Sequence, residues 1–270
     1  MKKIIAIITA RGGSKRIPRK NIKEFCGKPI IEYSIEAALK SNIFDEVMVS
    51  TDDSEIAQIA INAGAKVPFF RSEATSNDFS TTRDVLIEVL TEYEKRGRTF
   101  DYMVCLYPTN PFITAQKLIE AFDILEREQC EEVIPVVRFS YPPQRAYVLD
   151  KSNNLKYKWE EYKNTRSQDL EPFYHDAGQF YCYNVQQYLM DNGNIEGKVC
   201  PIILSEYEVQ DIDNMDDWKM AEMKYRFLTE KEIPNILIIE YPAILKSNIP
   251  STLLTQASFN IVIALSLIHI

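Results

Sequence analysis

The stretch Thr9-Ala10-Arg11-Gly12-Gly13-Ser14-Lys15-Arg16-Ile17-Pro18-Arg19-Lys20-Asn21 decides the fold of this chain. It directly follows the apolar run 4–8, which is typical of a buried strand. Pro29 and an apolar pattern at helical spacing then predict a helix, with Ile30, Ile31, Ile35, Ala38 and Leu39 on its buried face. The quoted stretch is therefore the first strand-to-helix loop of an α/β unit, at the edge where open α/β sheets bind ligands.

The charge of this loop indicates an anionic ligand. Residues 11–28 carry seven basic side chains against one acid, Glu24, so the segment has a charge of +6. The whole chain has a net charge of −8, and the other residues therefore sum to −14. Arg11 and Lys15 flank two glycines whose backbone N–H groups can turn outward, which favours a polyphosphate ligand. A solvated basic face is the alternative interpretation, above all for Arg16, Arg19 and Lys23. The loop has neither a P-loop motif nor a dinucleotide fingerprint.

The rest of the chain alternates between expected strands and helices. Further strands are predicted at 47–50, 67–70, 101–107, 133–137, 179–183 and 199–204, and further helices at 54–63, 85–93, 118–125 and 216–228. Asp53 or Ser54 is expected to cap the helix at 54–63. This spacing predicts an α/β fold with a Rossmann-like, mostly parallel, doubly wound sheet. Residues 139–177 break the pattern and predict an inserted, partly β subdomain over the sheet.

Bulk properties place the chain among soluble cytoplasmic proteins. The acidic net charge argues against nucleic-acid binding. No apolar run is long enough for a signal peptide or a membrane span. Five scattered cysteines are expected to be buried or idle thiols rather than disulfides or a zinc site. Residues 229–270 end in the apolar run 259–270 and are expected to be an atypical tail, non-native or non-functional, with an extra docking helix as the alternative.

A second motif, Glu208-Val209-Gln210-Asp211-Ile212-Asp213, indicates a metal site. In an extended segment Asp211 and Asp213 project to the same face, so both carboxylates can reach one cation. Mg²⁺ prefers carboxylate and phosphate oxygens, and phosphates and Mg²⁺ normally bind together. The alternative is a solvated acidic edge before a helix capped near Asn214.

These motifs resemble a known family. Ala-Arg-Gly-Gly-Ser-Lys followed by Pro-x-Lys-Asn is similar to the signature of the acylneuraminate cytidylyltransferases, the CMP-sialic acid synthetase family, and the resemblance runs from Lys2 to about Leu228. Such enzymes activate nine-carbon acidic sugars with CTP on a fold of the nucleotide-diphospho-sugar transferase type. The resemblance implies a domain at 1–228, a homodimer to which residues 139–177 contribute the dimerisation and sugar-site subdomain, and Mg²⁺ held by Asp211 and Asp213.

The resemblance also assigns the nucleotide site. Arg11, Lys15 and Lys20 are expected to hold the phosphates and to act in catalysis. The implied nucleotide contacts are Ala10, Arg11, Gly12, Gly13, Ser14, Lys15, Lys20, Asn21, Arg71, Ser76, Asp78 and Ser80. Without the resemblance, residues 71–81 are an ordinary polar loop. The family recognises cytosine there mainly through backbone groups, whose donors and acceptors have fixed positions.

The sugar side departs from the sialic acid enzymes. The segment 106–112 reads Leu-Tyr-Pro-Thr-Asn-Pro-Phe where those enzymes carry Leu-Gln-Pro-Thr-Ser-Pro-Leu, so a sugar-contacting glutamine is absent. The segments 141–145, 164–170 and 174–178 resemble the pseudaminic acid cytidylyltransferase branch instead. The implied sugar contacts are Tyr107, Thr109, Gln144, Arg145, Arg166, His175 and Asp176.

The expected reaction is CTP-dependent activation of pseudaminic acid, in which the anomeric hydroxyl attacks the α-phosphorus and pyrophosphate leaves. One alternative is the same reaction on sialic, legionaminic or 3-deoxy-octulosonic acid. A more distant one is a non-catalytic nucleotide sensor or an RNA-binding module that uses the basic loop. The pair Asp211 and Asp213 disfavours the sensor and the RNA binder, because neither needs a metal beside an α-phosphate.

Overall fold

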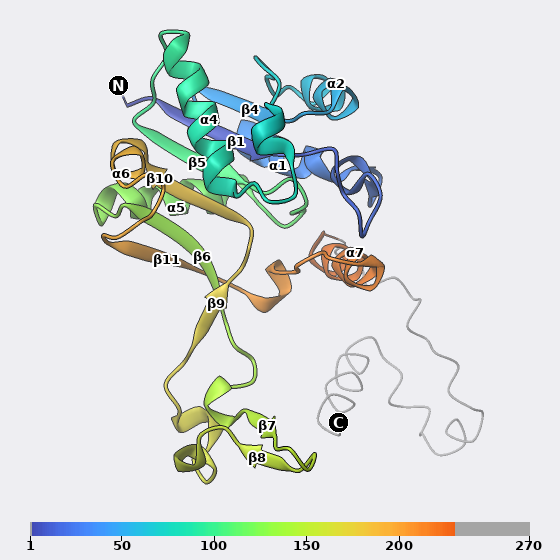
Figure 1. Cartoon of the computed structure of the whole chain (residues 1–270), viewed down its shortest axis with the longest axis vertical. Helices are drawn as coiled ribbons and strands as arrows, with labels where there is room; N and C mark the ends of the chain where they lie inside the picture. Colours follow the sequence, from blue (N-terminus) through green and yellow to red (C-terminus); the bar gives the residue numbers. More distant parts are fainter. Residues whose placement is uncertain (1, 230–270) are drawn as a thin grey trace, which may run out of the picture. The chain divides into compact units, whose positions relative to one another are not determined.

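The structure is a computed structural model, and it describes residues 2–229. A central sheet runs through this part of the chain (Figure 1). The hydrogen-bonded strand order is β11-β6-β10-β5-β1-β4, and β9 pairs with β6 beside this path. The strands are β1 (Ile4–Thr9), β4 (Glu46–Ser50), β5 (Tyr102–Leu106), β6 (Glu132–Arg138), β9 (Tyr174–Asp176), β10 (Phe180–Asn184) and β11 (Val199–Leu204).

The direction of the strands confirms the expected mostly parallel α/β sheet. β1 is parallel to both β4 and β5, and β6 is parallel to β11. β10 is antiparallel to both β5 and β6, so these two strands share one direction as well. Only β9 and β10 run against the rest of this sheet within the described residues. The carboxyl ends of β1, β4 and β5 therefore meet at one edge.

Helices cover both faces of the sheet, which explains why residues 4–8 of β1 are all apolar. Ala6 and Ile8 face a core shared with α1, α2 and α5, whereas Ile5 and Ile7 face a second core shared with α4 and α6. A strand that is buried on both faces needs apolar residues at every position. The helices are α1 (Ile30–Ser41), α2 (Ser54–Asn62), α3 (Glu73–Ser76), α4 (Thr82–Lys95), α5 (Ala115–Arg127), α6 (Val185–Met190) and α7 (Met215–Thr229).

A third, smaller core packs segments near the start of the chain against segments near residue 215. Ile17 of the basic loop and Ile212 of the acidic segment are buried together with Phe25 and Trp218. Phe25 belongs to the short hairpin β2 (Glu24–Phe25) and β3 (Lys28–Pro29), and Trp218 to α7. Burial of this apolar cluster fixes the basic loop beside the acidic segment, although the two are far apart in the sequence. The asparagine cap that the sequence predicts is also present, because Asn214 Oδ1 accepts from the N–H groups of residues 216 and 217.

The predicted strand at 67–70 is wrong. β4 makes only one isolated bridge on that side, between Met48 and Lys66. Lys66 donates its N–H to Val47 at 2.9 Å and accepts from Val49 at 2.9 Å, and the ladder then stops. Pro68 explains this end, because proline has no N–H to donate to a ladder.

The inserted subdomain is present and partly β, but it projects away from the sheet rather than lying over it as predicted (Figure 1). It contains the hairpin of β7 (Tyr147–Leu149) and β8 (Leu155–Tyr157), followed by irregular segments up to β9. No residue of 139–176 belongs to the three buried cores. The hairpin side chains instead stay exposed, including Leu149 and Leu155.

Short 3-10 turns complete the described secondary structure: η1 (Lys20–Ile22), η2 (Pro143–Arg145), η3 (Glu160–Tyr162), η4 (Ser167–Asp169) and η5 (Glu206–Glu208).

The cysteine prediction needs a correction. Cys130 and Cys200 form a disulfide across 70 residues of sequence. Pairing of β11 with β6 places Cys200 opposite Val133, close to Cys130, which lies two residues before β6 begins. Cys105 and Cys182 are buried free thiols, as predicted.

Two further predictions concern the membrane and the tail. No helix within residues 2–229 is long and apolar enough to cross a bilayer. The predicted atypical tail begins at the last residue of α7, and its remainder at 230–270 lies outside the described residues.

Candidate active site

A cleft of about 430 Å³ opens at the carboxyl ends of β1 and β5. Three segments meet in it, namely the basic loop after β1, the loop after β5 and the acidic segment before α7. Its lining consists of Thr9, Arg11, Ser14, Lys15, Arg16, Ile17, Lys20, Asn21, Tyr107, Pro108, Thr109 and Asp213. Four of these side chains are cationic and one is anionic, so the cleft suits an anion. A cavity of about 410 Å³ at the opposite ends of these strands contains none of the predicted site residues.

The backbone of the basic loop is held by its neighbours on the sheet edge. Ala10 donates its N–H to Ser50 O at 3.0 Å, which continues the β1–β4 ladder into the loop. Asn21 is buried and donates Nδ2–H to Arg11 O at 2.8 Å. Gly12 donates its N–H to Asp52 Oδ1 at 2.9 Å. The loop is thus shaped before any ligand binds, and Asn21 contributes to that shape.

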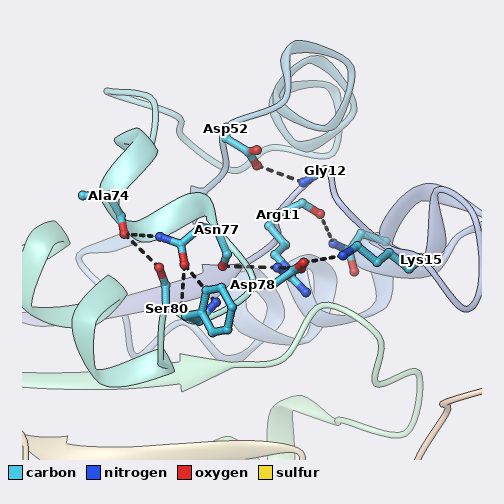
Figure 2. A network of polar contacts seen from close by, with 10 residues as sticks. Arg11, Gly12, Lys15, Asp52, Ala74, Asn77, Asp78 and Ser80 are labelled. Carbon is cyan, nitrogen blue, oxygen red and sulfur yellow. Dashed lines mark hydrogen bonds and ion pairs between the residues drawn. The ribbon is translucent and has the colours of Figure 1, made fainter.

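Asp78 contacts the two cations on which the phosphate prediction depends (Figure 2). Arg11 Nη1 lies 2.7 Å from Asp78 Oδ1, and the Lys15 ammonium pairs with Asp78 Oδ2. Arg11 Nη1 also donates to Asn77 O at 3.3 Å. The hydrogen bond from Lys15, and after it that from Arg11, lowers the pKa of the Asp78 carboxyl. Arg11 and Lys15 therefore point toward one shared anionic group, which shows that a single ligand can reach both.

The three basic residues for which a solvated face was the main alternative each have a partner. Arg16 Nη1 lies 2.7 Å from Asp213 Oδ2 in the cleft. The Lys23 ammonium lies 5.5 Å from the ring centre of Trp218. Arg19 pairs with a carboxylate at the start of α2. Of the three, only Arg16 lines the cleft.

Arg71, the first residue of the polar loop 71–81, is buried rather than presented to the cleft. Its exposed fraction is 9%, and burial lowers the pKa of its guanidinium. Nε donates to Ser50 Oγ at 3.1 Å and Nη2 donates to Ser50 O at 2.7 Å. The hydroxyls of Ser76 and Ser80 donate to backbone carbonyls of their own loop. The nucleotide contacts assigned to Arg71, Ser76, Asp78 and Ser80 stay predictions.

The acidic segment reaches the cleft through an anchored backbone. Ile212 is 2% exposed and packs in the third core, while Asp211 and Asp213 on either side of it are not buried. Lys20 Nζ donates to Ile212 O at 2.7 Å. Burial lowers the pKa of Lys20, and the charges of Asp213 and then Asp211 oppose this shift. Both carboxylates therefore lie within electrostatic reach of Lys20, as one extended segment requires.

This donor set fits a magnesium ion. Carboxylate oxygens are hard ligands, and Mg²⁺ is usually held in proteins by one or two of them together with phosphate oxygens and waters. No cluster of three or more histidine, cysteine or acidic side chains able to hold a metal exists within residues 2–229. Asp211 and Asp213 would thus supply two ligands, and the substrate phosphates and water would supply the rest.

Two of the predicted sugar residues line the cleft, and one of them is connected to Asp176 through a second tyrosine. Tyr107 and Thr109 contribute to its wall. The ring of Tyr107 lies 5.5 Å from that of Tyr181, whose hydroxyl donates to Asp176 Oδ2 at 2.8 Å. Asp176 therefore connects to the cleft through Tyr181, a residue for which the sequence predicted no role in the site. Its only sequence signal is its place in the predicted strand at 179–183.

The other predicted sugar residues do not line this cleft. Gln144 is buried and donates Nε2–H to Glu171 O at 2.8 Å, so it ties the inserted subdomain together. Arg166 pairs with Asp169 at 2.8 Å, and Arg145 Nη1 lies 3.4 Å from Ser167 Oγ. The His175 ring packs on Phe139 with ring centres 4.7 Å apart. Their assignment to the sugar stays a prediction.

Asp52 and Asp53 follow β4, and from the sequence only a helix cap is predicted there, at Asp53 or Ser54. In the structure Asp52 accepts from the backbone of the basic loop, and Asp53 contacts the Arg19 side chain. Two consecutive acids at the end of the strand beside β1 were the available signal, because carboxyl ends of adjacent parallel strands meet at one edge.

The family model and the relatives that match this chain point to the same family. The family model described as Cytidylyltransferase matches residues 5–227. The pseudaminic acid cytidylyltransferase of Campylobacter jejuni serotype O:2 is 39% identical over 224 residues, which is 83% of this chain and 97% of that protein. The CMP-N,N'-diacetyllegionaminic acid synthase of Legionella pneumophila is 33% identical over 227 residues, covering 82% of this chain and 95% of that protein.

A solved structure supports the fold independently. The CMP:2-keto-3-deoxy-manno-octonic acid synthetase complexed with CTP superposes with a TM-score of 0.60 at 20% identity. The match covers 82% of this chain and 97% of that chain. At this identity the likeness establishes the shared fold.

Proposed function

The chain belongs to the cytidylyltransferase family, and from that premise we propose that it transfers the CMP group of CTP to pseudaminic acid. The products are CMP-pseudaminic acid and pyrophosphate. The observation that carries the proposal is the cleft in which Arg11 and Lys15, the Tyr107 loop and Asp213 meet. In this proposal the triphosphate binds the basic loop, the sugar binds the loop after β5, and the metal binds the acidic segment. The proposed setting is the cytoplasm, where CTP is made.

The reaction is an in-line displacement at the α-phosphorus. The oxygen of the sugar's anomeric hydroxyl forms a bond to this phosphorus, the bond to the pyrophosphate oxygen breaks, and the hydroxyl proton passes to solvent. Catalysis of this kind depends on positioning and on neutralising charge. Arg11 and Lys15 supply that charge where the phosphates bind, and the shaped backbone of residues 10–14 supplies the positioning.

Asp211 and Asp213 are the proposed holders of Mg²⁺, which when bound neutralises phosphate charge and lowers the pKa of the attacking hydroxyl. Lys20 fixes the distance between the two halves of the site, because its ammonium bonds to Ile212 O between the two acids. Arg16 holds the Asp213 carboxylate at the cleft wall. The loop that binds the phosphates and the segment that binds the metal are thereby one unit.

The sugar is proposed to lie against Tyr107 and Thr109, at the side of the cleft where the sequence departs from the sialic acid enzymes. A guanidinium matches a carboxylate with two parallel hydrogen bonds, so Arg145 or Arg166 would receive the sugar carboxylate. Both lie in the inserted subdomain, outside the cleft of their own chain. In the proposed homodimer, the exposed hairpin of β7 and β8 from one subunit reaches the cleft of the other subunit. This accounts for the position of both arginines outside the cleft of their own chain. The exposed side chains Leu149 and Leu155 on that hairpin support such a contact.

The experiment that tests the proposal is a panel of acidic sugars with CTP and Mg²⁺, scored by pyrophosphate release. We expect pseudaminic acid to give the highest kcat/KM, with legionaminic, sialic and 3-deoxy-octulosonic acids below it. A higher kcat/KM for one of these three would replace the proposed substrate while keeping the reaction. UTP in place of CTP is the matched control for the nucleotide.

A further inference from the structure

The two phosphate-binding cations are already paired with a carboxylate that belongs to the protein. Figure 2 shows the Asp78 side chain between Arg11 and Lys15. One carboxylate oxygen lies 2.7 Å from Arg11 Nη1, and the other pairs with the Lys15 ammonium. Each oxygen thus makes the contact that a phosphate oxygen would make. The Asp78 carboxylate therefore occupies the position next to Arg11 and Lys15 that a phosphate group of the ligand would take.

The turn that carries Asp78 keeps its own shape. The side-chain oxygen of Asn77 accepts from Phe79 N at 2.8 Å and from Ser80 N at 3.1 Å. Asn77 Nδ2 and the Ser80 hydroxyl both donate to Ala74 O, at 2.7 and 2.9 Å. These bonds lie within residues 74–80 and do not involve the basic loop. The turn can therefore leave the basic loop without losing its internal hydrogen bonds.

Few contacts attach this turn to the basic loop. They are the two ion pairs of Asp78 and the bond from Arg11 to Asn77 O at 3.3 Å. All three charged side chains are partly exposed, from 38% for Arg11 to 78% for Lys15. Exposed ion pairs contribute little to stability, so an incoming anion can displace Asp78 at low cost. Phe79, which is 93% exposed, also gives the turn no packing against the protein.

A carboxylate and a phosphate cannot occupy these contacts together, because like charges at such distances repel strongly. We propose that Asp78 is an internal counter-ion that competes with the phosphates of CTP and of pyrophosphate for Arg11 and Lys15. This inference rests on the proposed function, since it assumes that these cations bind the triphosphate. While Asp78 occupies Arg11 and Lys15, the protein cannot bind a phosphate there, so only a fraction of the molecules is competent to bind. That fraction raises the dissociation constants of CTP and of pyrophosphate by the same factor. Asp78 would therefore weaken substrate and product by one factor, and its return to the cations would favour release of pyrophosphate.

The test compares Asp78→Asn with the wild type. Isothermal titration calorimetry at low ionic strength would give the dissociation constants of CTP and of sodium pyrophosphate for the full chain. We expect Asp78→Asn to lower both constants by the same factor, about three- to tenfold. Product inhibition by pyrophosphate should become stronger by that factor. The control is Asp123→Asn, which removes an exposed carboxylate from α5 and should change both constants less than about twofold.

The outcomes separate this inference from the proposed function. Unchanged constants in Asp78→Asn, for a protein that still transfers CMP, would overturn the inference alone. Weaker CTP binding in this variant would also overturn it and would favour the nucleotide contact that the sequence predicts for Asp78. Tighter pyrophosphate binding in Asp78→Asn, with no CMP transfer by the wild type to any sugar, would overturn the proposed CMP transfer but not the phosphate binding by Arg11 and Lys15 on which the inference rests. Thermal melting of both variants establishes that each is folded.

Discussion

Arg19 and Asp53 form a two-contact ion pair that ties the basic loop to the first turn of α2. Arg19 Nη2 lies 3.1 Å from Asp53 Oδ1, and Nη1 contacts Oδ2. Arg19 has a φ of 56°, in the left-handed region that is costly for a residue with a Cβ atom. At the other end of the loop, a Cβ on Gly12 would lie 2.9 Å from Asp53 Oδ2. One carboxyl group therefore lies close to both ends of the loop that holds the cations.

Replacing Asp53 by asparagine should make stability less dependent on acid pH. Asparagine keeps the N-cap, which accepts from the N–H groups of Glu55 and Ile56, but loses the charge that pairs with Arg19. The Arg19 hydrogen bond, opposed by desolvation and helped by the backbone N–H of Ile56, lowers the pKa of Asp53 to about 2. A lowered pKa stabilises the fold above the unfolded value of about 3.9 and loses this effect as pH falls toward 2.

Urea denaturation at pH 7 and pH 3 measures this effect. The wild type should lose about 1 kcal/mol more than Asp53→Asn between these two pH values. Glu55→Gln is the control, because Glu55 is more exposed than Asp53 and pairs with the same arginine. Equal losses in the wild type and in Asp53→Asn would contradict the assigned ion pair.

Removal of either carboxylate of the acidic segment should stop turnover rather than binding. Asp211→Asn and Asp213→Asn should each lower kcat by about a hundredfold or more, because charge at the reacting phosphate would go uncompensated. The KM for CTP should change far less, since the basic loop remains intact. Chelation with EDTA should abolish wild-type turnover, and added Mg²⁺ should restore it. Near-normal rates of both variants at saturating Mg²⁺ would show that these acids do not hold the metal.

Lys15→Ala should bind CTP almost normally yet turn over slowly. Its ammonium sits on a flexible stem at the cleft wall, where it can follow charge onto the leaving pyrophosphate. Loss of one such donor typically lowers kcat about a hundred- to thousandfold, with kcat/KM falling in parallel. Lys23→Ala is the matched control, because Lys23 lies over Trp218 outside the cleft. Steady-state kinetics with equal, small effects in both variants would mean that the loop is only a basic surface.

Arg71→Lys should destabilise the fold. Lysine cannot reproduce two donors from one planar group, so the Ser50 hydroxyl or carbonyl would lose its buried partner. The expected cost is about 1–3 kcal/mol in urea denaturation. The ratio of kcat/KM for CTP to that for UTP reports separately on cytosine recognition. A variant that is as stable as the wild type but discriminates poorly between CTP and UTP would assign Arg71 to the base instead of the fold.

Local patterns in the sequence were sufficient for the fold class and for the charge of the site. The apolar run 4–8 predicted a buried strand because all five of its residues are apolar, and the structure confirms it. The basic loop could be placed at the ligand-binding edge because it lies between a strand and a helix. The exposed acids on either side of Ile212 followed from the period of two in extended chains. Each of these inferences needs only residues that are close in sequence.

Contacts between distant segments were decided by the tertiary structure alone. Lys20 meets Ile212 O across 192 residues, and Lys15 meets Asp78 across 63. Both contacts require the strand order of the sheet and the third core, which no local pattern specifies. The Cys130–Cys200 disulfide was missed for the same reason, since it depends on β11 pairing with β6. The sequence could thus predict that cations and acids surround the site, but only the packing of strands and loops decided which acid neutralises which cation, because electrostatic partners are chosen by distance in space.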